Sequence, residues 1–162
     1  ALAVAHHGIV TAAVIYLPLR GKLYSAAAGQ GAFLNGSAIL ATDTAELAGS
    51  SVLSAKPNFA SKNWRSAVPK VARSYRPSLA YRLALVAEGR FDAMLTLRDS
   101  WEWDIAAGDL ILREAGALCS DKTGAPLRFN NVRPMLNGVV CAGARVHRQI
   151  IEALDHPDPR PA

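Results

Sequence analysis

The sequence has few of the residues from which zinc sites, disulfide frameworks and membrane spans are built. Only two of its 162 residues are cysteines, Cys119 and Cys141, and each lies in an apolar segment without C-x-x-C spacing or a neighbouring histidine cluster. This pattern argues against a zinc site and against a disulfide framework, so we expect a reducing, cytoplasmic location. No apolar run reaches the roughly 20 residues needed to cross a bilayer, and we expect no membrane partner.

Blocks of charge of one sign are also missing. The formal net charge is +5, but the lysines and arginines are scattered along the chain from Arg20 to Arg160. A scattered positive charge does not make the basic stripe or patch by which proteins bind nucleic acid. We therefore expect no nucleic-acid partner.

The composition is that of one globular domain, with 51% hydrophobic and 19% charged residues. We expect this domain to cover residues 1–154 and to be followed by a flexible tail at 155–162, which contains three prolines. The chain opens with Ala1, in a segment typical of a strand and without the charged start of a signal peptide. We expect that no signal peptide is present and that an upstream segment has been lost.

Two apolar, β-branched runs at 2–6 and 9–17 flank the His7-Gly8 corner and predict a β-hairpin. The order of the predicted elements is an antiparallel meander followed by alternating helices and strands. It predicts an α/β fold, a layered αβ sandwich with a mixed sheet, in which helices cover one face of the meander. The other expected elements are strands at 22–28, 38–40, 51–54, 91–97, 117–120 and 138–142, and helices within 61–73 and at 78–88, 103–115 and 145–154.

The segment from Trp101 to Asp109 carries the clearest chemical signal. Asp104 is expected in the first turn of a helix, where the helix dipole and the unpaired N–H groups favour a negative charge. Such a carboxylate suits Mg²⁺, a hard cation that prefers oxygen ligands, but an N-cap role alone is the other interpretation. The small residues 106–108 predict that this helix packs closely against a neighbouring backbone.

Other polar and aromatic residues have more ordinary interpretations. The Gly29–Gly31 segment lacks the lysine and the following helix of a phosphate-binding loop, so a turn at a strand end is favoured. Asp109 and Glu114 lie mostly off the helical face of the candidate carboxylate, and we expect them to be solvated or ion-paired. Trp101 and Trp103 fit packing beside the site and core packing equally well.

The string Trp103-Asp104-Ile105-Ala106-Ala107-Gly108, continuing to Ile111 and to Glu114-Ala115-Gly116, resembles the second signature of the inositol monophosphatase family. The resemblance extends over residues 1–154, because three further stretches agree with the family in order and spacing. These are Tyr16-Leu17-Pro18 leading to Gly21-Lys22-Leu23-Tyr24, the segment from Gly29 to Gly36, and the segment from Ser78 to Ala93.

The resemblance implies a layered phosphomonoesterase fold with Mg²⁺ ions at the active site. It makes Asp104 a catalytic, metal-binding aspartate, and it places Ser78, which opens the preceding helix, near the substrate. Two positions depart from the family. Pro77 stands where the family has glycine, and Leu97 stands where animal inositol phosphatases have a substrate-contacting glutamate, which weakens an inositol preference.

The first signature of the family, aspartate-proline, an apolar residue and then aspartate-glycine-threonine, is missing, as is a glutamate that acts with it. We therefore expect the chain to be the C-terminal portion of such an enzyme. The family resemblance implies a metal-dependent phosphatase, a phosphoric monoester hydrolase, but this fragment alone is expected to bind metal weakly and to be incompetent in turnover.

Three functions are open from the sequence. The first is Mg²⁺-dependent hydrolysis of a small phosphorylated metabolite such as inositol monophosphate, by a protein that forms a possible homodimer. The second is a 3′(2′),5′-bisphosphate nucleotidase of the same family, since Glu102-Trp103-Asp104 followed by two alanines and a glycine resembles that branch. The third is a non-catalytic remnant that acts as a binding or oligomerisation module.

Overall fold

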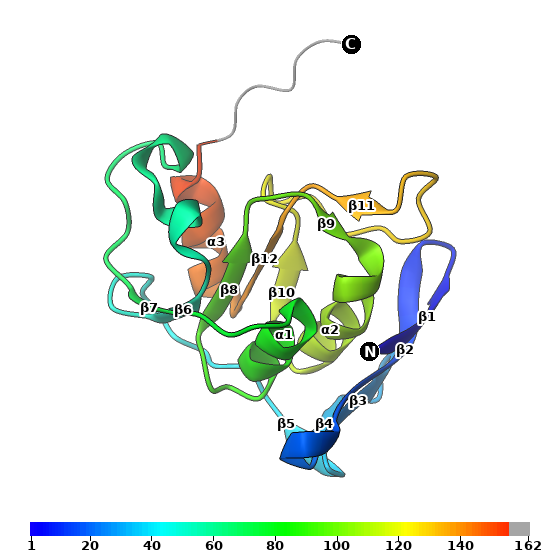
Figure 1. Ribbon diagram of the computed structural model, residues 1–162. Helices are drawn as coiled ribbons and strands as arrows, with labels where there is room; N and C mark the ends of the chain where they lie inside the picture. Colours follow the sequence, from blue (N-terminus) through cyan, green and yellow to red (C-terminus); the bar gives the residue numbers. More distant parts are fainter. Residues whose placement is uncertain (156–162) are drawn as a thin grey trace.

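The structure is a computed structural model that describes residues 1–155. Figure 1 shows four layers in the order sheet, two helices, sheet, helix: β1–β5 form the first sheet, α1 and α2 lie beside it, and a second sheet separates them from α3. One hydrophobic core joins the first three layers, and a second core lies between the second sheet and α3. The expected α/β sandwich is confirmed, whereas the tail predicted at 155–162 lies outside the described residues except for Asp155.

The first sheet is an antiparallel meander whose strands follow chain order. Alternate side chains of its strands, among them Ile15 and Tyr24, are buried against α2. An antiparallel sheet with one face covered by helices forms its hydrophobic core on that face. The opposite face exposes apolar side chains such as Leu2 and Val4. The strands are β1 (Leu2–His6), β2 (Ile9–Leu17), β3 (Lys22–Ala27), β4 (Ala32–Leu34) and β5 (Ser37–Ile39), with a 3₁₀ turn at Pro18–Arg20.

The second sheet is mixed and has the strand order β10-β12-β8-β6-β7. Its central strands β8 and β12 are buried on both faces, so they carry continuous apolar runs instead of an alternating pattern. Met94 and Cys141 belong to the core shared with α1 and α2, while Leu95 and Val140 belong to the core shared with α3. The strands are β6 (Ser51–Leu53), β7 (Ala72–Ser74), β8 (Ala93–Thr96), β10 (Leu118–Ser120) and β12 (Val139–Ala142).

Three α-helices occur in the described residues: α1 (Leu79–Ala87), α2 (Glu102–Glu114) and α3 (Ala144–Ala153). They confirm the helices expected at 78–88, 103–115 and 145–154. The segment 61–73, expected to be helical in part, contains a 3₁₀ helix at Ser61–Asn63 but no α-helix, and the chain reaches strand β7 at residue 72. Pro69 lies in this stretch and cannot donate an intrahelical hydrogen bond. A further 3₁₀ helix at Lys56–Phe59 and the paired two-residue strands β9 (Ser100–Trp101) and β11 (Met135–Leu136) are too short to show a periodicity in the sequence.

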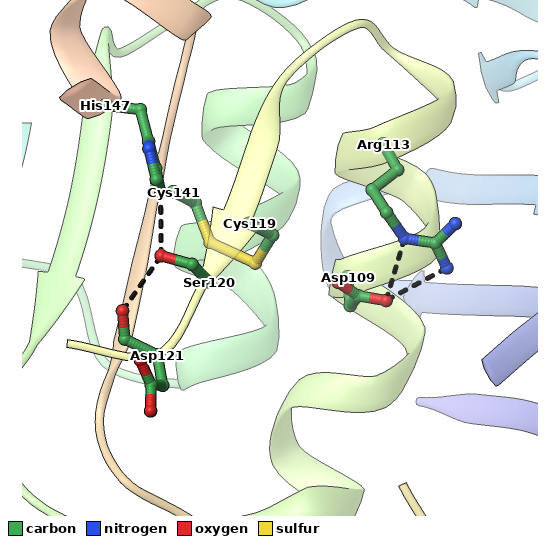
Figure 2. The surroundings of a disulfide bond; sticks show 7 residues. All are labelled: Asp109, Arg113, Cys119, Ser120, Asp121, Cys141 and His147. Atoms are coloured by element: carbon green, nitrogen blue, oxygen red, sulfur yellow. Dashed lines mark hydrogen bonds and ion pairs between the residues drawn. A yellow bond between two sulfur atoms is a disulfide. The ribbon is translucent and has the colours of Figure 1, made fainter. Parts of the chain in front are cut away.

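Cys119 and Cys141 lie directly opposite each other on the antiparallel strands β10 and β12 and form a disulfide (Figure 2). Their Cα atoms are 4.4 Å apart, at the short end of the range that a disulfide spans. The expectation that the cysteines form no disulfide was therefore wrong, because strand register brings together two residues that show no spacing signal. Structural disulfides are rare in reducing compartments, and the cytoplasmic location stays a prediction.

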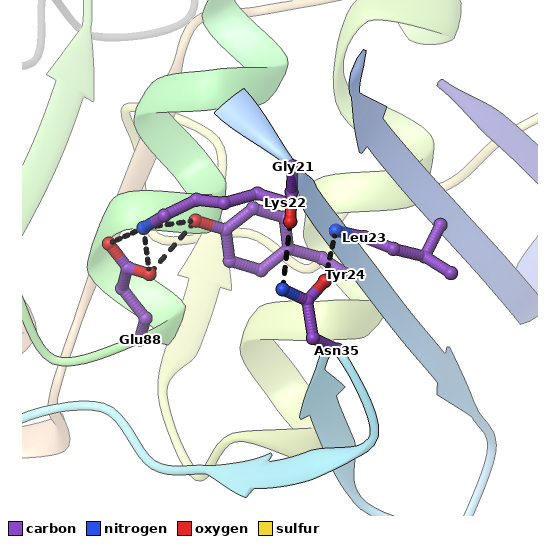
Figure 3. A network of polar contacts seen from close by, with 6 residues as sticks. All are labelled: Gly21, Lys22, Leu23, Tyr24, Asn35 and Glu88. Carbon is purple, nitrogen blue, oxygen red and sulfur yellow. Dashed lines mark hydrogen bonds and ion pairs between the residues drawn. The ribbon is translucent and has the colours of Figure 1, made fainter. Parts of the chain in front are cut away.

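A partly buried polar network joins the C-terminal end of α1 to strand β3 (Figure 3). The Lys22 ammonium group donates to both carboxylate oxygens of Glu88, at 2.9 and 2.7 Å, and the Tyr24 hydroxyl donates to one of them at 2.9 Å. Burial, followed by the hydrogen bond to Glu88, raises the pKa of Tyr24. Beside it, Asn35 bridges Gly21 and Leu23 and fixes the turn into β3. The network fastens the helix that carries Ser78 to the first sheet.

Each helix within residues 1–155 falls short of the length and apolar character that crossing a bilayer would require.

Candidate active site

The N-terminal ends of α1 and α2 open onto one pocket of about 560 Å³. This pocket brings together Ser78 and Asp104, the two site residues predicted from the sequence, although 25 residues separate them in the chain. The pocket is lined by Ala1, Tyr75, Ser78, Leu79, Ala80, Arg82, Arg98, Trp103 and Asp104.

Asp104 is the third residue of α2, and its side chain is exposed in the pocket. Trp101 occupies the N-cap position, so the interpretation of Asp104 as an N-cap alone is wrong. Within residues 1–155 no hydrogen bond or ion pair engages the Asp104 carboxylate. The positive end of the α2 dipole stabilises a negative charge in this first turn. The carboxylate therefore lies at the N-terminal end of α2 and has no partner among residues 1–155.

Glu102, two residues earlier, is already engaged elsewhere. Its buried carboxylate accepts hydrogen bonds from the backbone N–H of Asn130 at 2.7 Å and from the Asn131 side chain at 2.6 Å. It holds the loop that leads to β11 against the start of α2. The sequence offered no sign of this, because the two partners are distant in the chain. Glu102 therefore has a structural role and is not a second free carboxylate.

The described residues do not make a complete magnesium site. Among residues 1–155 no group of three or more His, Cys, Asp or Glu side chains gathers where it could hold a metal ion. Mg²⁺ requires near-octahedral coordination by oxygen atoms, and the pocket provides one carboxylate, Asp104, beside the cationic Arg82 and Arg98. Asp104 fits one ligand position of such a site, and other groups would have to complete it.

Ser78 caps α1 and has an unusual backbone conformation. Its Oγ atom accepts a hydrogen bond from the Tyr81 N–H at 3.3 Å, which satisfies one free donor of the first turn. Its φ of 67° lies in the left-handed region, which costs about 1–3 kcal/mol for a residue other than glycine. Pro77 precedes this residue, and the positive φ falls on the serine. Ser78 thus lies in the pocket as an exposed helix cap.

Arg82 is a pocket residue that sequence reasoning missed. It lies one turn after Ser78 on α1, is only 6% exposed, and its Nε donates to the Ser78 carbonyl at 3.4 Å. The guanidinium carbon is 5.3 Å from the ring centroid of Tyr75. Burial lowers the pKa of Arg82, and the nearby charge of Arg98 also lowers it. The i, i+4 spacing of Ser78 and Arg82 was the available signal, since such residues share one helix face.

The Gly29–Gly31 turn is occupied by a side chain of the protein. The Glu114 carboxylate accepts the N–H groups of Gly29 at 2.9 Å and Gly31 at 2.8 Å, so these donors are not free to bind a phosphate. The Gly29 hydrogen bond is the main reason why the pKa of Glu114 is lowered. Glu114 is partly exposed, and nothing in the sequence indicated its hydrogen bonds to this turn. Asp109 is ion-paired with Arg113 at 3.0 Å, as expected.

Trp101 and Trp103 stack on each other near the pocket, with ring centroids 4.6 Å apart. Trp103 is 60% exposed and Trp101 is 42% exposed, so core packing does not explain them. Trp103 lines both the candidate pocket and an adjacent cavity of about 490 Å³. The pair therefore presents an aromatic surface beside Asp104.

Comparisons with known proteins agree with this architecture. Residues 1–156 match the model of the Inositol monophosphatase family. Nus factor SuhB of Escherichia coli (strain K12) is 33% identical over 150 residues, which cover 88% of this chain and 54% of that protein. Inositol-1-monophosphatase of Rhizobium meliloti (strain 1021) is 30% identical over 167 residues, which cover 98% of this chain and 60% of that protein.

Solved structures share the fold. Inositol monophosphatase from Anabaena (Nostoc) sp. PCC 7120 has a TM-score of 0.71 at 28% identity, over 90% of this chain and 58% of that chain. The suhB protein of Bartonella henselae has a TM-score of 0.75 at 25% identity, over 93% of this chain and 58% of that chain. The chain spans about half the length of the SuhB relative and 60% of the Rhizobium enzyme. By its family match and its fold, the chain belongs to the inositol monophosphatase family.

Proposed function

We propose that this chain forms one wall of the active site of a Mg²⁺-dependent phosphatase that hydrolyses a small phosphorylated metabolite such as inositol monophosphate. The observation that carries the proposal is the exposed carboxylate of Asp104 in the first turn of α2, which pairs with no group of residues 1–155. It shares its pocket with Ser78 at the start of α1. Two helix N-termini directed at one pocket favour an anionic ligand, because their unpaired N–H groups and dipoles are positive there.

The residues of this chain have separate roles in the proposal. Asp104 provides one oxygen ligand for the cation, while Ser78 fixes the first turn of α1 and the orientation of its N–H groups toward the phosphate. Magnesium is inferred from the resemblance to the family, and residues 1–155 supply only part of its ligand set. We therefore expect weak Mg²⁺ binding and negligible phosphate release from this chain alone.

Paramagnetic Mn²⁺, used in place of Mg²⁺, tests the role of Asp104. Electron paramagnetic resonance of the free ion should show weak binding by the chain, and Asp104→Asn should abolish it. Asp99→Asn is the matched control, because Asp99 is an exposed aspartate that does not line the pocket. Equal binding by the wild type and Asp104→Asn would overturn the metal-ligand role and, with it, the proposed function. Phosphate release from inositol 1-phosphate at the rate of a complete family member would contradict the expected incompetence of the chain.

A 3′(2′),5′-bisphosphate nucleotidase is a second candidate, favoured by the exposed Trp103 ring at the pocket. An aromatic face at this place can stack on a nucleobase, which is worth about 1–3 kcal/mol. Leu97 stands where animal inositol phosphatases are expected to have a substrate-contacting glutamate, and this leucine does not argue against a nucleotidase. Adenosine 5′-monophosphate should then quench the tryptophan fluorescence, and Trp103→Ala should weaken its binding. Equal binding of ribose 5-phosphate by the wild type would argue against base stacking.

A binding or oligomerisation module without catalysis is the alternative from another class. The exposed Leu2 and Val4 side chains on the outer face of the first sheet are the surface that it would use. Light scattering after size-exclusion chromatography tests this alternative and the possible homodimer together. A monomer at high protein concentration would argue against both, whereas a dimer that Leu2→Asp separates would support them.

A further inference from the structure

The disulfide between Cys119 and Cys141 closes a loop that holds the start of helix α2. We propose that this disulfide is a thiol-exchange site: a low-molecular-weight thiol attacks the Cys119 sulfur from an adjacent pocket, and reduction releases the loop from α2. We call residues 121–138 the clamp loop. The exchange site stands without the proposed function, which only gives α2 its meaning as the helix of the candidate metal ligand.

The clamp loop is attached to the first residue of α2, Glu102. The backbone N–H of Glu102 donates to the Pro134 carbonyl at 3.1 Å. Its buried carboxylate accepts the backbone N–H of Asn130 at 2.7 Å and that of Asn131 at 3.2 Å. Strand β11 of the loop pairs with β9, which directly precedes the helix. Because Asp104 follows Glu102 by two residues, the loop fixes the turn that carries the candidate carboxylate.

The disulfide is the covalent link at the base of the clamp loop. Cys119 lies on β10, a three-residue strand at the edge of the second sheet, whereas Cys141 lies on β12, which pairs with β8 on its other side. The two cysteines are 22 residues apart, and a cross-link over such a loop disfavours its open state by up to about a hundredfold in the loop-entropy account. Reduction should therefore leave β12 in the sheet and loosen β10 and the clamp loop.

The two sulfur atoms differ in their access to solvent. Cys141 is fully buried, whereas Cys119 is partly exposed and lines a pocket of about 200 Å³. In Figure 2, Cys119 is on the side of the disulfide that faces Asp109 and Arg113, which line the same pocket. These two residues form an ion pair, so the exposed Arg128 gives the pocket its net positive charge. Positive surroundings favour a thiolate, which is the nucleophile of the exchange.

The exchange consists of two displacement steps. A thiolate first forms a bond to the Cys119 sulfur, the bond to Cys141 breaks, and Cys141 leaves as a thiolate that takes a proton from water. A second thiolate then attacks the reagent sulfur of this mixed disulfide, forms the reagent disulfide and releases the Cys119 thiolate. The protein disulfide gains two electrons, and two thiols lose them. In the cytoplasmic location expected from the sequence, disulfides are usually of this transient, redox-sensing kind.

Amide hydrogen exchange, followed by NMR on the 162-residue chain, tests the release of the loop. In dithiothreitol, the N–H groups of Glu102, Asn130 and Asn131 should exchange about tenfold faster than in the oxidised chain, because the pairing of β10 with β12 retains part of the loop closure. Strands β3, β4 and β5 are the control, since none of them pairs with β10 or β12. Cys119→Ala should behave like the reduced wild type in both buffers. If this variant does not fold, the wild type in the two buffers still decides the result.

Two small thiols test the approach through the pocket, because 2-mercaptoethanesulfonate differs from 2-mercaptoethanol by one negative charge. Mass spectrometry of quenched samples measures how fast each forms a mixed disulfide at Cys119, with rates corrected for the thiolate fraction. The sulfonate should react roughly three- to fivefold faster. Arg128→Gln should remove most of this difference, whereas Arg148→Gln, at an exposed arginine of α3, should leave it unchanged.

Five outcomes would each overturn the exchange site. They are two free thiols in the oxidised chain, equal exchange of the three amides in both buffers, equal acceleration in β3–β5, equal rates of the two thiols, and equal effects of the two arginine variants. No measurement in this set requires a metal ion or turnover. Failure of the Mn²⁺ test would thus refute the proposed function without affecting this result, and the reverse also holds.

Discussion

Gly108 sets the distance between the two helices that form the candidate pocket. An added Cβ at this position would lie 2.6 Å from Cβ and 3.0 Å from Cγ of Leu83 on α1, and would also meet its Cδ1 atom. Leu83 is fully buried, and its Cβ is attached directly to the α1 backbone, so a rotamer change cannot relieve the contact. We predict that Gly108→Ala pushes α1 away from α2 and destabilises the protein.

The size of this effect follows from two opposing contributions. Replacing glycine by alanine inside a helix normally stabilises a protein by about 0.5–1 kcal/mol. Overpacking a core typically costs about 1–3 kcal/mol, and a contact near the main chain belongs at the upper end of that range. We expect a net loss of about 1–2 kcal/mol in the free energy of unfolding. For a chain of this size, the melting temperature should fall by about 2–8 °C.

Urea denaturation followed by circular dichroism measures the loss, and three further variants separate its causes. Ala106→Gly, on the same helix, reports the helix-propensity contribution, expected to be about 0.5–1 kcal/mol. Leu83→Ala alone should cost about 2–5 kcal/mol. The double variant Gly108→Ala with Leu83→Ala should be more stable than the sum of the single effects predicts, because truncation frees space for the new methyl group. A Gly108→Ala protein more stable than the wild type would refute the close approach of the helices.

Two further predictions concern buried polar groups. Glu88→Gln should lower the free energy of unfolding by about 1–3 kcal/mol, because it leaves the Lys22 ammonium group without its charged partner, although that side chain is 24% exposed and can still reach water. Adding Lys22→Met should recover part of this loss in urea titrations, and an unchanged midpoint for Glu88→Gln would contradict the network. Burial lowers the pKa of His147, whose ring lies 2.8 Å from the Ser120 hydroxyl (Figure 2). The neutral His147 side chain should contribute its full stabilisation above the unfolded-state pKa of about 6.5. This contribution should decrease as the pH falls below that value, since the imidazole binds a proton more readily in the unfolded state. Thermal melts between pH 7.5 and 5 should show less pH dependence in His147→Gln, and equal dependence in both proteins would exclude this cause.

The locally encoded parts of the fold could be predicted from the sequence. The hairpin around His7 and Gly8 was found because two apolar, β-branched runs flank a turn dipeptide. Helices α1 and α2 were found because apolar spacing and a following glycine lie within one short window, and Ser78 is in addition a capping residue of α1. The segment at 61–73 was predicted only in part, since it contains a single 3₁₀ helix and the path of the rest depends on tertiary contacts. Trp64, for example, is buried beside α3 and pairs with Leu154, which ends that helix.

The sequence by itself determined the family and identified Asp104 as the candidate carboxylate, because both lie in a continuous string of residues. Only the tertiary structure decided that Ser78, Arg82 and Arg98 share a pocket with it. It also decided that Cys119 meets Cys141. The physical reason is that packing of helices and strands sets these proximities, and packing depends on contacts between residues far apart in the chain.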